Sequence, residues 1–292
     1  MEDLLLRTGI NLGIYIILVL SANLTVGMAN LLTLCQAAFY GIGAYIGTFF
    51  LMHFHLPFVV IALFVMLATG LTSLLVSFAS VKLKGDYFLL ATLGFQVIVF
   101  SIFNNWEDVT HGPNGIRGIP GIQLGGFWML DGNLDFFIFT LFLVLFSVLF
   151  FYRLQRSPFG RTLRALQSDE LPTQALGRDT SSAKDWAFFL SAAFAGMAGL
   201  VFAAYKHSVT PTTFSLDESI SILTALFIGG IGNKVWGPVI GAALVVIIPV
   251  LLRFLELPAI VTGNLQQILF GLLLVVLMFV RPQGLMGNTT MK

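Results

Sequence analysis

Two histidines separated by one residue form the spacing in this chain that most resembles part of a metal site. The string "HFH" holds His53 and His55, and imidazole nitrogens are common ligands of zinc. A zinc site needs three or four ligands, and the surrounding sequence offers no further one. We therefore interpret the pair as residues at a membrane edge, and the sequence predicts no metal site.

The chain also lacks the short motifs of nucleotide-binding and hydrolytic sites. A P-loop reads G-x-x-x-x-G-K-[ST], and the nearest string, "GGIGNKV", has valine after the lysine. Neither H-E-x-x-H nor G-x-S-x-G occurs. The sequence therefore predicts no catalytic residue and no bound cofactor in this chain, which counts against an intramembrane enzyme.

Uncharged polar side chains are the groups that remain inside the apolar runs, and two interpretations of them stay open. In the first, they hydrogen-bond to one another between helices; in the second, Thr92 and Gln96, one helical turn apart, line a translocation path. The runs hold no acidic or basic group that could bind a coupling ion, as secondary transporters usually do. The deep polar groups are Asn23, Asn30, Gln96, Gln266 and Gln267.

The elements that position these groups are membrane helices. Of the 292 residues, 57% are hydrophobic and 10% are charged, whereas soluble domains carry about 25% charged residues. Residues 8–81 include no charged side chain, enough for two or three crossings of about 20 residues each. The remaining uncharged runs are Tyr87–Trp106, Phe136–Tyr152, Trp186–Tyr205, Ser219–Asn233, Val235–Leu252 and Leu257–Val280. We predict an all-α polytopic membrane protein with eight or nine transmembrane or re-entrant helices, forming one domain over residues 1–292.

The basic residues predict which end of the bundle faces the cytoplasm. Six of the fifteen Lys and Arg residues lie in 153–184, whereas 107–135 contains Arg117 alone. By the positive-inside rule, the first loop is cytoplasmic, the second is external and the C-terminus is cytoplasmic. The side of the N-terminus stays open, as does whether residues 34–50 cross or re-enter. The net charge of +1 predicts no nucleic-acid partner.

Glycines cluster in two apolar stretches, "CQAAFYGIGAYIG" and "GGIGNKVWGPVIGA". Small residues at a spacing of four mark close helix contacts in membranes, and such tight packing is one interpretation. In the other, the two halves form an inverted repeat whose broken helices lie beside the transport path. The path residues predicted on this second interpretation are Gly41, Gly43, Gly230 and Gly232, together with Thr92 and Gln96.

A polar segment, "SPFGRTLRALQSDELPTQALGRD", interrupts the apolar chain at residues 157–179. Ser157 can cap a helix that begins at Pro158, and Gly177 can end a second short helix. Phe159, Leu163 and Leu166 recur at spacings of four and three, which indicates an amphipathic helix. Such short helices need a surface to pack against. That surface is either the membrane or a cytoplasmic partner protein.

This segment resembles the cytoplasmic coupling loop of permease subunits of ABC importers for branched-chain amino acids. Further strings resemble motifs of that family in the same order along the chain. They are "LLTLCQAAFYGIGAY", "LKGDYFLLATLGF", "HGPNGIRGIP", "SISILTALFIGGIGNKVWGPVIGA" and "RPQGLMG". The form "KGDYF" is similar to the M-type subunit of these importers rather than to its H-type partner.

The resemblance implies a permease that imports leucine, isoleucine and valine by alternating access across the bacterial inner membrane. ATP and Mg would be bound by partner ABC ATPase subunits, beside a second, homologous permease. A periplasmic or extracellular binding protein would deliver the amino acid near Asn114 and Gly115. A permease for urea or amides and a self-sufficient secondary transporter are the alternatives. The coupling loop would lie within 153–184, and its contact residues would be Gly160, Arg164, Ala165, Leu166, Ala175, Leu176 and Gly177.

Overall fold

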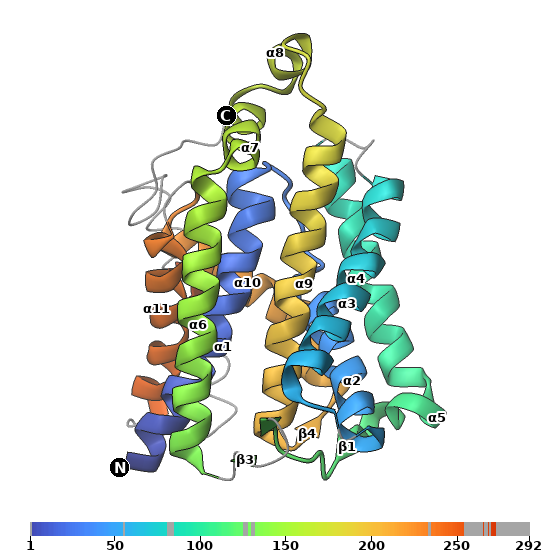
Figure 1. Ribbon diagram of the computed structural model, residues 1–292, viewed down its shortest axis with the longest axis vertical. Helices are drawn as coiled ribbons and strands as arrows, with labels where there is room; N and C mark the ends of the chain where they lie inside the picture. Colours follow the sequence, from blue (N-terminus) through green and yellow to red (C-terminus); the bar gives the residue numbers. More distant parts are fainter. Residues whose placement is uncertain are drawn as a thin grey trace.

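The computed structural model is a bundle of helices that run mostly along one axis (Figure 1). It describes residues 2–54, 56–80, 85–124, 128–129, 132–232 and 235–253, together with residues 265, 268 and 270–272. The long elements are α1 (Glu2–Ala22), α2 (Gln36–His53), α3 (Phe58–Ser80), α4 (Asp86–Asn105), α6 (Asn133–Arg156), α9 (Thr180–Lys206), α10 (Leu216–Gly229) and α11 (Trp236–Arg253).

Shorter elements lie at the two ends of these helices. A π-helix, η1 (Asn23–Met28), continues α1. The polar segment forms α7 (Pro158–Ser168) and α8 (Glu170–Ala175). The loops at the other end hold α5 (Glu107–Thr110), η2 (Gly112–Asn114), β1 (Ile116–Arg117), β2 (Gln123–Leu124), β3 (Trp128–Met129), β4 (Ser208–Val209) and η3 (Pro211–Phe214).

The helices confirm the predicted polytopic membrane protein. Within the described residues, five spans are long and apolar enough to cross a membrane: α1 with η1, α3, α4, α6 and α9. The shorter helices α2, α10 and α11 occupy the other predicted segments. The predicted segment Leu257–Val280 lies mostly outside the described residues.

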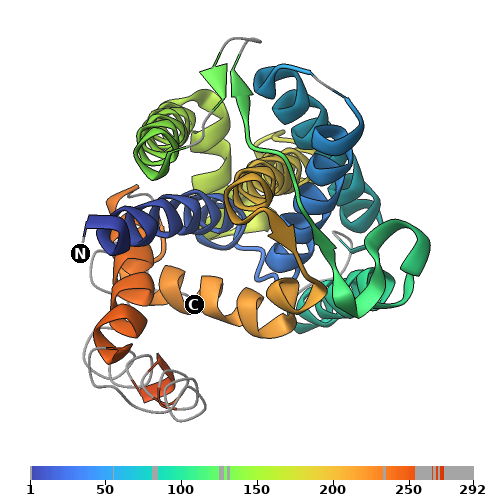
Figure 2. The same ribbon diagram turned by 90° about the horizontal axis from the view of Figure 1, so that it is seen from below.

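Helix α9 forms the centre of the bundle, as the view along the axis shows (Figure 2). Its sequence is rich in alanine and glycine, and most of it is buried. These small residues let neighbouring backbones approach closely. A Cβ atom on Gly43 of α2 would lie 2.2 Å from the Gly196 carbonyl oxygen of α9. The outer helices α3, α4 and α6 instead expose Leu, Ile and Phe side chains.

The glycine stretches differ from the expectation that both of them break helices. Helix α2 is continuous through Gly41, Gly43 and Gly47, and the break comes before it, at residues 29–35. The second stretch does contain a break, between α10 and α11. There Gly230 and Gly232 have φ angles of 107° and 122°, which non-glycine residues rarely adopt. The glycines in α2 therefore serve close packing.

The two halves of the chain nevertheless share an arrangement. In each, a long helix (α1 or α9) is followed by a connection without an α-helix, a shorter helix (α2 or α10) and a further helix (α3 or α11). The corresponding helices run in opposite directions along the bundle (Figure 1). This is the order expected of the predicted inverted repeat.

The predicted loops lie at opposite ends of the bundle. Helices α7 and α8 occupy one end, and strands β1 and β4 occupy the other, where Ile116 pairs with Val209 (Figure 1). The N-terminus lies at the β1 end (Figure 1), which is the external end on the orientation predicted from the basic residues. The segment 29–53 returns from the α7 end to the β1 end, and its helical part begins inside the bundle.

Candidate functional site at the α7 end

Helix α7 begins as its sequence predicts. The Ser157 hydroxyl accepts a hydrogen bond from the Gly160 backbone N–H at 3.2 Å, with Pro158 in the first helical position. Such a cap contributes about 1 kcal/mol. Leu163 and Leu166 are buried against the bundle. The predicted amphipathic helix is confirmed, and its apolar side packs on this chain itself.

Gly160 lies against the end of α6. A Cβ atom at this position would lie 2.4 Å from the Leu154 carbonyl oxygen and 2.5 Å from that of Gln155. The Arg164 guanidinium donates to the same Gln155 carbonyl at 3.3 Å. Both residues therefore help to hold the corner between α6 and α7, where the sequence alone predicted contact with a partner.

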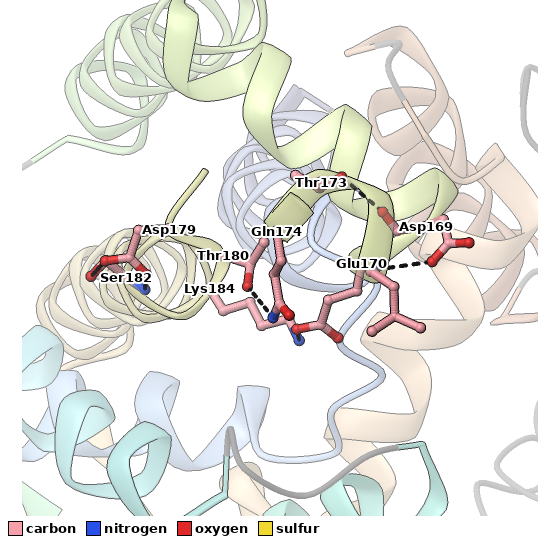
Figure 3. A network of polar contacts seen from close by, with 9 residues as sticks. Asp169, Glu170, Thr173, Gln174, Asp179, Thr180, Ser182 and Lys184 are labelled. Carbon is pink, nitrogen blue, oxygen red and sulfur yellow. Dashed lines mark hydrogen bonds and ion pairs between the residues drawn. The ribbon is translucent and has the colours of Figure 1, made fainter. Parts of the chain in front are cut away.

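Helix α8 is fixed by polar contacts at both of its ends (Figure 3). The Asp169 carboxylate caps it by accepting from the Leu171 N–H at 3.1 Å. Lys184 of α9 forms an ion pair with Glu170 at 2.6 Å, and the Gln174 amide donates to the Thr180 hydroxyl at 2.8 Å. These contacts place a six-residue helix that would not be stable alone.

The start of α9 is capped within the same network (Figure 3). The Asp179 carboxylate accepts hydrogen bonds from the Ser182 hydroxyl at 2.6 Å and from its N–H at 3.1 Å. These bonds lower the pKa of Asp179 below its ordinary value because they favour the ionised carboxylate. The charge suits the positive end of a helix dipole.

Exposure divides the predicted contact residues into two groups. Gly160 and Leu166 are buried, and Arg164 is half-buried, whereas Ala165, Ala175, Leu176 and Gly177 are exposed. Leu176 is 82% exposed, and Leu171, which the sequence reasoning missed, is 69% exposed. The signal for Leu171 was a large apolar residue two positions after the cap Asp169, in a short helix with no other large apolar residue. We call Leu171 and Leu176, with Ala175 and Gly177, the exposed α8 surface.

Helix α7 is also connected to the interior. The Gln167 side chain donates to the Gly27 carbonyl of η1 at 2.7 Å. One turn earlier in η1, the Asn23 amide donates to the Gly232 carbonyl at 3.2 Å. Gly232 belongs to the break between α10 and α11. Two hydrogen bonds and one π-helix thus join α7 to the second half of the chain.

The predicted path residues are buried contacts in this conformation. Gln96 accepts from the Ala38 N–H at 2.7 Å and donates to the Phe214 carbonyl at 2.9 Å. Thr92 accepts from the Leu34 N–H at 3.2 Å. These side chains satisfy the backbone where α2 begins inside the bundle, as the hydrogen-bonding interpretation expected. Their role in a path stays a prediction.

The other deep polar groups are placed differently. Asn30 is exposed, with a φ angle of 54°, where the chain turns after η1. Gln266 and Gln267 lie outside the described residues, as does His55. The His53 ring stacks on Phe49, with 4.6 Å between ring centroids.

The β1 end holds the residues predicted for the external loop. Asn114 is exposed and lines a hollow of about 430 Å³ with Met52 and Arg117. Gly115 has a φ angle of 65°, and a Cβ atom there would lie 2.2 Å from the Val209 carbonyl oxygen. Only glycine fits this turn beside β4. Receipt of cargo at this hollow stays a prediction.

Comparison with known proteins decides the family. Residues 4–278 match the family model described as the permease component of a branched-chain amino acid transport system. The chain belongs to this permease family. The permease is 34% identical to the high-affinity branched-chain amino acid transport system permease proteins LivM of Salmonella typhimurium and Escherichia coli K12. Each alignment covers 94% of this chain and 68% of the relative.

The permease is also 24% identical to a more distant relative, a probable branched-chain amino acid transport permease protein LivH of Methanocaldococcus jannaschii, over 94% of this chain. The higher identity to LivM agrees with the M-type resemblance of the sequence. No solved structure matches the permease.

Proposed function

We propose that the permease is one of two homologous transmembrane subunits of an ATP-driven importer of leucine, isoleucine and valine. It moves its cargo by alternating access, in which the bundle opens to one side of the membrane at a time. ATP and Mg bind to partner ABC ATPase subunits, and a periplasmic or extracellular binding protein delivers the cargo at the β1 end. The substrate class rests on the LivM relatives.

The observation that supports docking of an ATPase is the exposed α8 surface. It presents Leu171 in the first turn of α8 and Leu176 directly after this helix, which the Glu170–Lys184 ion pair and the Asp169 cap hold in place. Exposed apolar groups at the centre of an otherwise polar surface are typical anchors of protein interfaces. The positive-inside rule, applied to the basic loop 153–184, supports a cytoplasmic position for this surface, where ATP is available.

The test is co-purification of the permease with its partners, followed by leucine uptake in proteoliposomes with ATP. Leu176→Glu puts a charge on the exposed α8 surface, and we expect recovery of the ATPase and the uptake rate each to fall about tenfold or more. The control is Leu134→Glu, because Leu134 is exposed at the opposite end of the bundle.

Wild-type permease that purifies without an ATPase, or that takes up leucine from an ion gradient alone, would contradict the proposal. Gly160→Glu is unsuitable as a docking test. Its side chain would collide with the end of α6, and loss of activity would not report on the partner.

A further inference from the structure

A cavity of about 440 Å³ lies between α1, α10 and α11, in the half of the bundle that carries the N-terminus. Its volume is within the range of about 300–1,000 Å³ found for small-molecule sites. Neither the exposed α8 surface nor the predicted path residues line it. Its lining combines both signs of charge with an apolar wall.

One wall of the cavity is polar. Helix α1 contributes Arg7, Asn11 and Tyr15, whose spacing of four places them on one face of the helix. Helix α10 contributes Glu218 and Ser221, which are three residues apart and also share a face. Lys206, the last residue of α9, lines the cavity as well.

The wall formed by α11 is apolar and contains a proline. Val245, Val246 and Val250 line it, together with Pro249. Proline lacks the N–H that would bond to the carbonyl four residues earlier, so the Val245 carbonyl loses its helical partner. This wall therefore offers branched apolar side chains and one additional backbone acceptor.

Glu218 is the group that gives the cavity its chemical character. The Tyr15 hydroxyl donates a hydrogen bond to its carboxylate, which fixes the carboxylate between α1 and α10. Among the described residues, Glu218 forms no ion pair. Its neighbour Asp217 is exposed and does not line the cavity, although it lies in the same first turn of α10. Asp217 alone therefore supplies a carboxylate at the positive end of the α10 dipole, and Glu218 is not needed for that role.

We propose that this cavity binds a zwitterionic α-amino acid with an apolar side chain, in the course of the import proposed above. The Glu218 carboxylate receives the ammonium group, and Arg7 and Lys206 receive the α-carboxylate. The valines of α11 receive the side chain. A ligand that lacks the ammonium group leaves the half-buried Glu218 carboxylate uncompensated, which disfavours its binding. A ligand that lacks the carboxylate forgoes the contact with Arg7.

The test uses the complete importer, purified with its partner subunits and reconstituted with ATP. Uptake of radiolabelled L-leucine is measured for wild type, Glu218→Gln and the matched control Asp217→Asn. Loss of a charge-assisted hydrogen bond predicts an uptake rate at least about tenfold lower for Glu218→Gln. The control, which removes a carboxylate one residue away, should retain the wild-type rate.

The outcomes separate this inference from the function on which it rests. If wild type imports leucine and Glu218→Gln imports it at the same rate, the cavity assignment is wrong and the importer stands. If the wild-type importer does not import leucine but leucine raises its melting temperature, the proposed function fails and the site stands.

A measurement on the wild-type permease covers the case in which Glu218→Gln does not assemble. L-leucine should raise its melting temperature, whereas 4-methylpentanoate, which lacks the ammonium, and isopentylamine, which lacks the carboxylate, should not. Arg7→Gln, at an exposed position, should abolish the leucine shift. Equal shifts by all three compounds, or an unchanged shift in Arg7→Gln, would overturn the assignment.

Discussion

Glycine residues determine how closely the backbones of this permease approach one another. At Gly43, a methyl group would lie 2.2 Å from the Gly196 carbonyl oxygen, and at Gly199 it would lie 2.1 Å from that of Tyr40. Backbone atoms on both sides cannot move aside as a flexible side chain can. The contact between α2 and α9 therefore depends on individual glycines, and each can be tested by one substitution.

We expect Gly43→Ala to destabilise the permease by about 1–3 kcal/mol, the usual cost of overpacking. Gly94 of α4 is the matched control, because a methyl group there would meet no atom within 4 Å. Alanine favours a helix over glycine, so Gly94→Ala should be neutral or stabilising. Thermal unfolding of both variants in the same detergent measures the difference. Equal melting temperatures would contradict the close contact.

At the scale of elements, α8 is a helix that other parts of the chain hold in place. Six residues are too few for an isolated helix, since nucleation is costly. Its stability comes from the Asp169 cap and from Glu170, whose partner Lys184 belongs to α9. The Lys184 side chain is 10% exposed and that of Glu170 is 31% exposed, so solvent screens the ion pair only in part.

Removal of this ion pair should loosen α8 and leave α7 unchanged. Lys184→Gln should cost about 1 kcal/mol, near the upper end for partly exposed pairs. Hydrogen exchange of the α8 amides should become about fivefold faster. The control Arg161→Gln removes an exposed charge from the same loop and should not change exchange in α8. Unchanged exchange in Lys184→Gln would show that the ion pair contributes nothing to α8.

At the scale of the whole molecule, the α7 end is joined to the break between α10 and α11. Gln167 bonds to η1, and Asn23 of η1 bonds to Gly232. Helix α10 extends from this break toward the β1 end, and Glu218 lies in its first turn. We expect a displacement of α7 by a bound partner to reach the cavity through these contacts.

The orientation of the molecule is tested by cysteine labelling in whole cells. The native Cys35 is buried, so it should not react with a membrane-impermeant maleimide. Asn114→Cys at the β1 end should be labelled in intact cells. Leu176→Cys on the exposed α8 surface should be labelled only after the membrane is opened. The reverse pattern would contradict the orientation derived from the basic loop.

The sequence by itself determined the membrane class, most of the long helical segments and the two short helices of the polar loop. Each depends on neighbours in the chain: runs of apolar residues, the Ser157 cap and a spacing of three and four. Charge placement put the loops 107–135 and 153–184 at opposite ends for the same reason. The family resemblance rested on contiguous strings such as "LKGDYFLLATLGF". Whether residues 8–81 hold two or three helices was decided by the structure, which has three there: α1, α2 and α3.

The tertiary structure alone decided which residues meet across the chain. Gly160 faces α6 and Leu171 faces solvent because of how the α6–α7 corner and α8 pack, and local spacing does not reveal this. Tyr15 and Glu218 are 203 positions apart, so only the packing of α1 against α10 brings them together. Nearby residues specify elements, whereas long-range packing specifies the cavity and the exposed α8 surface.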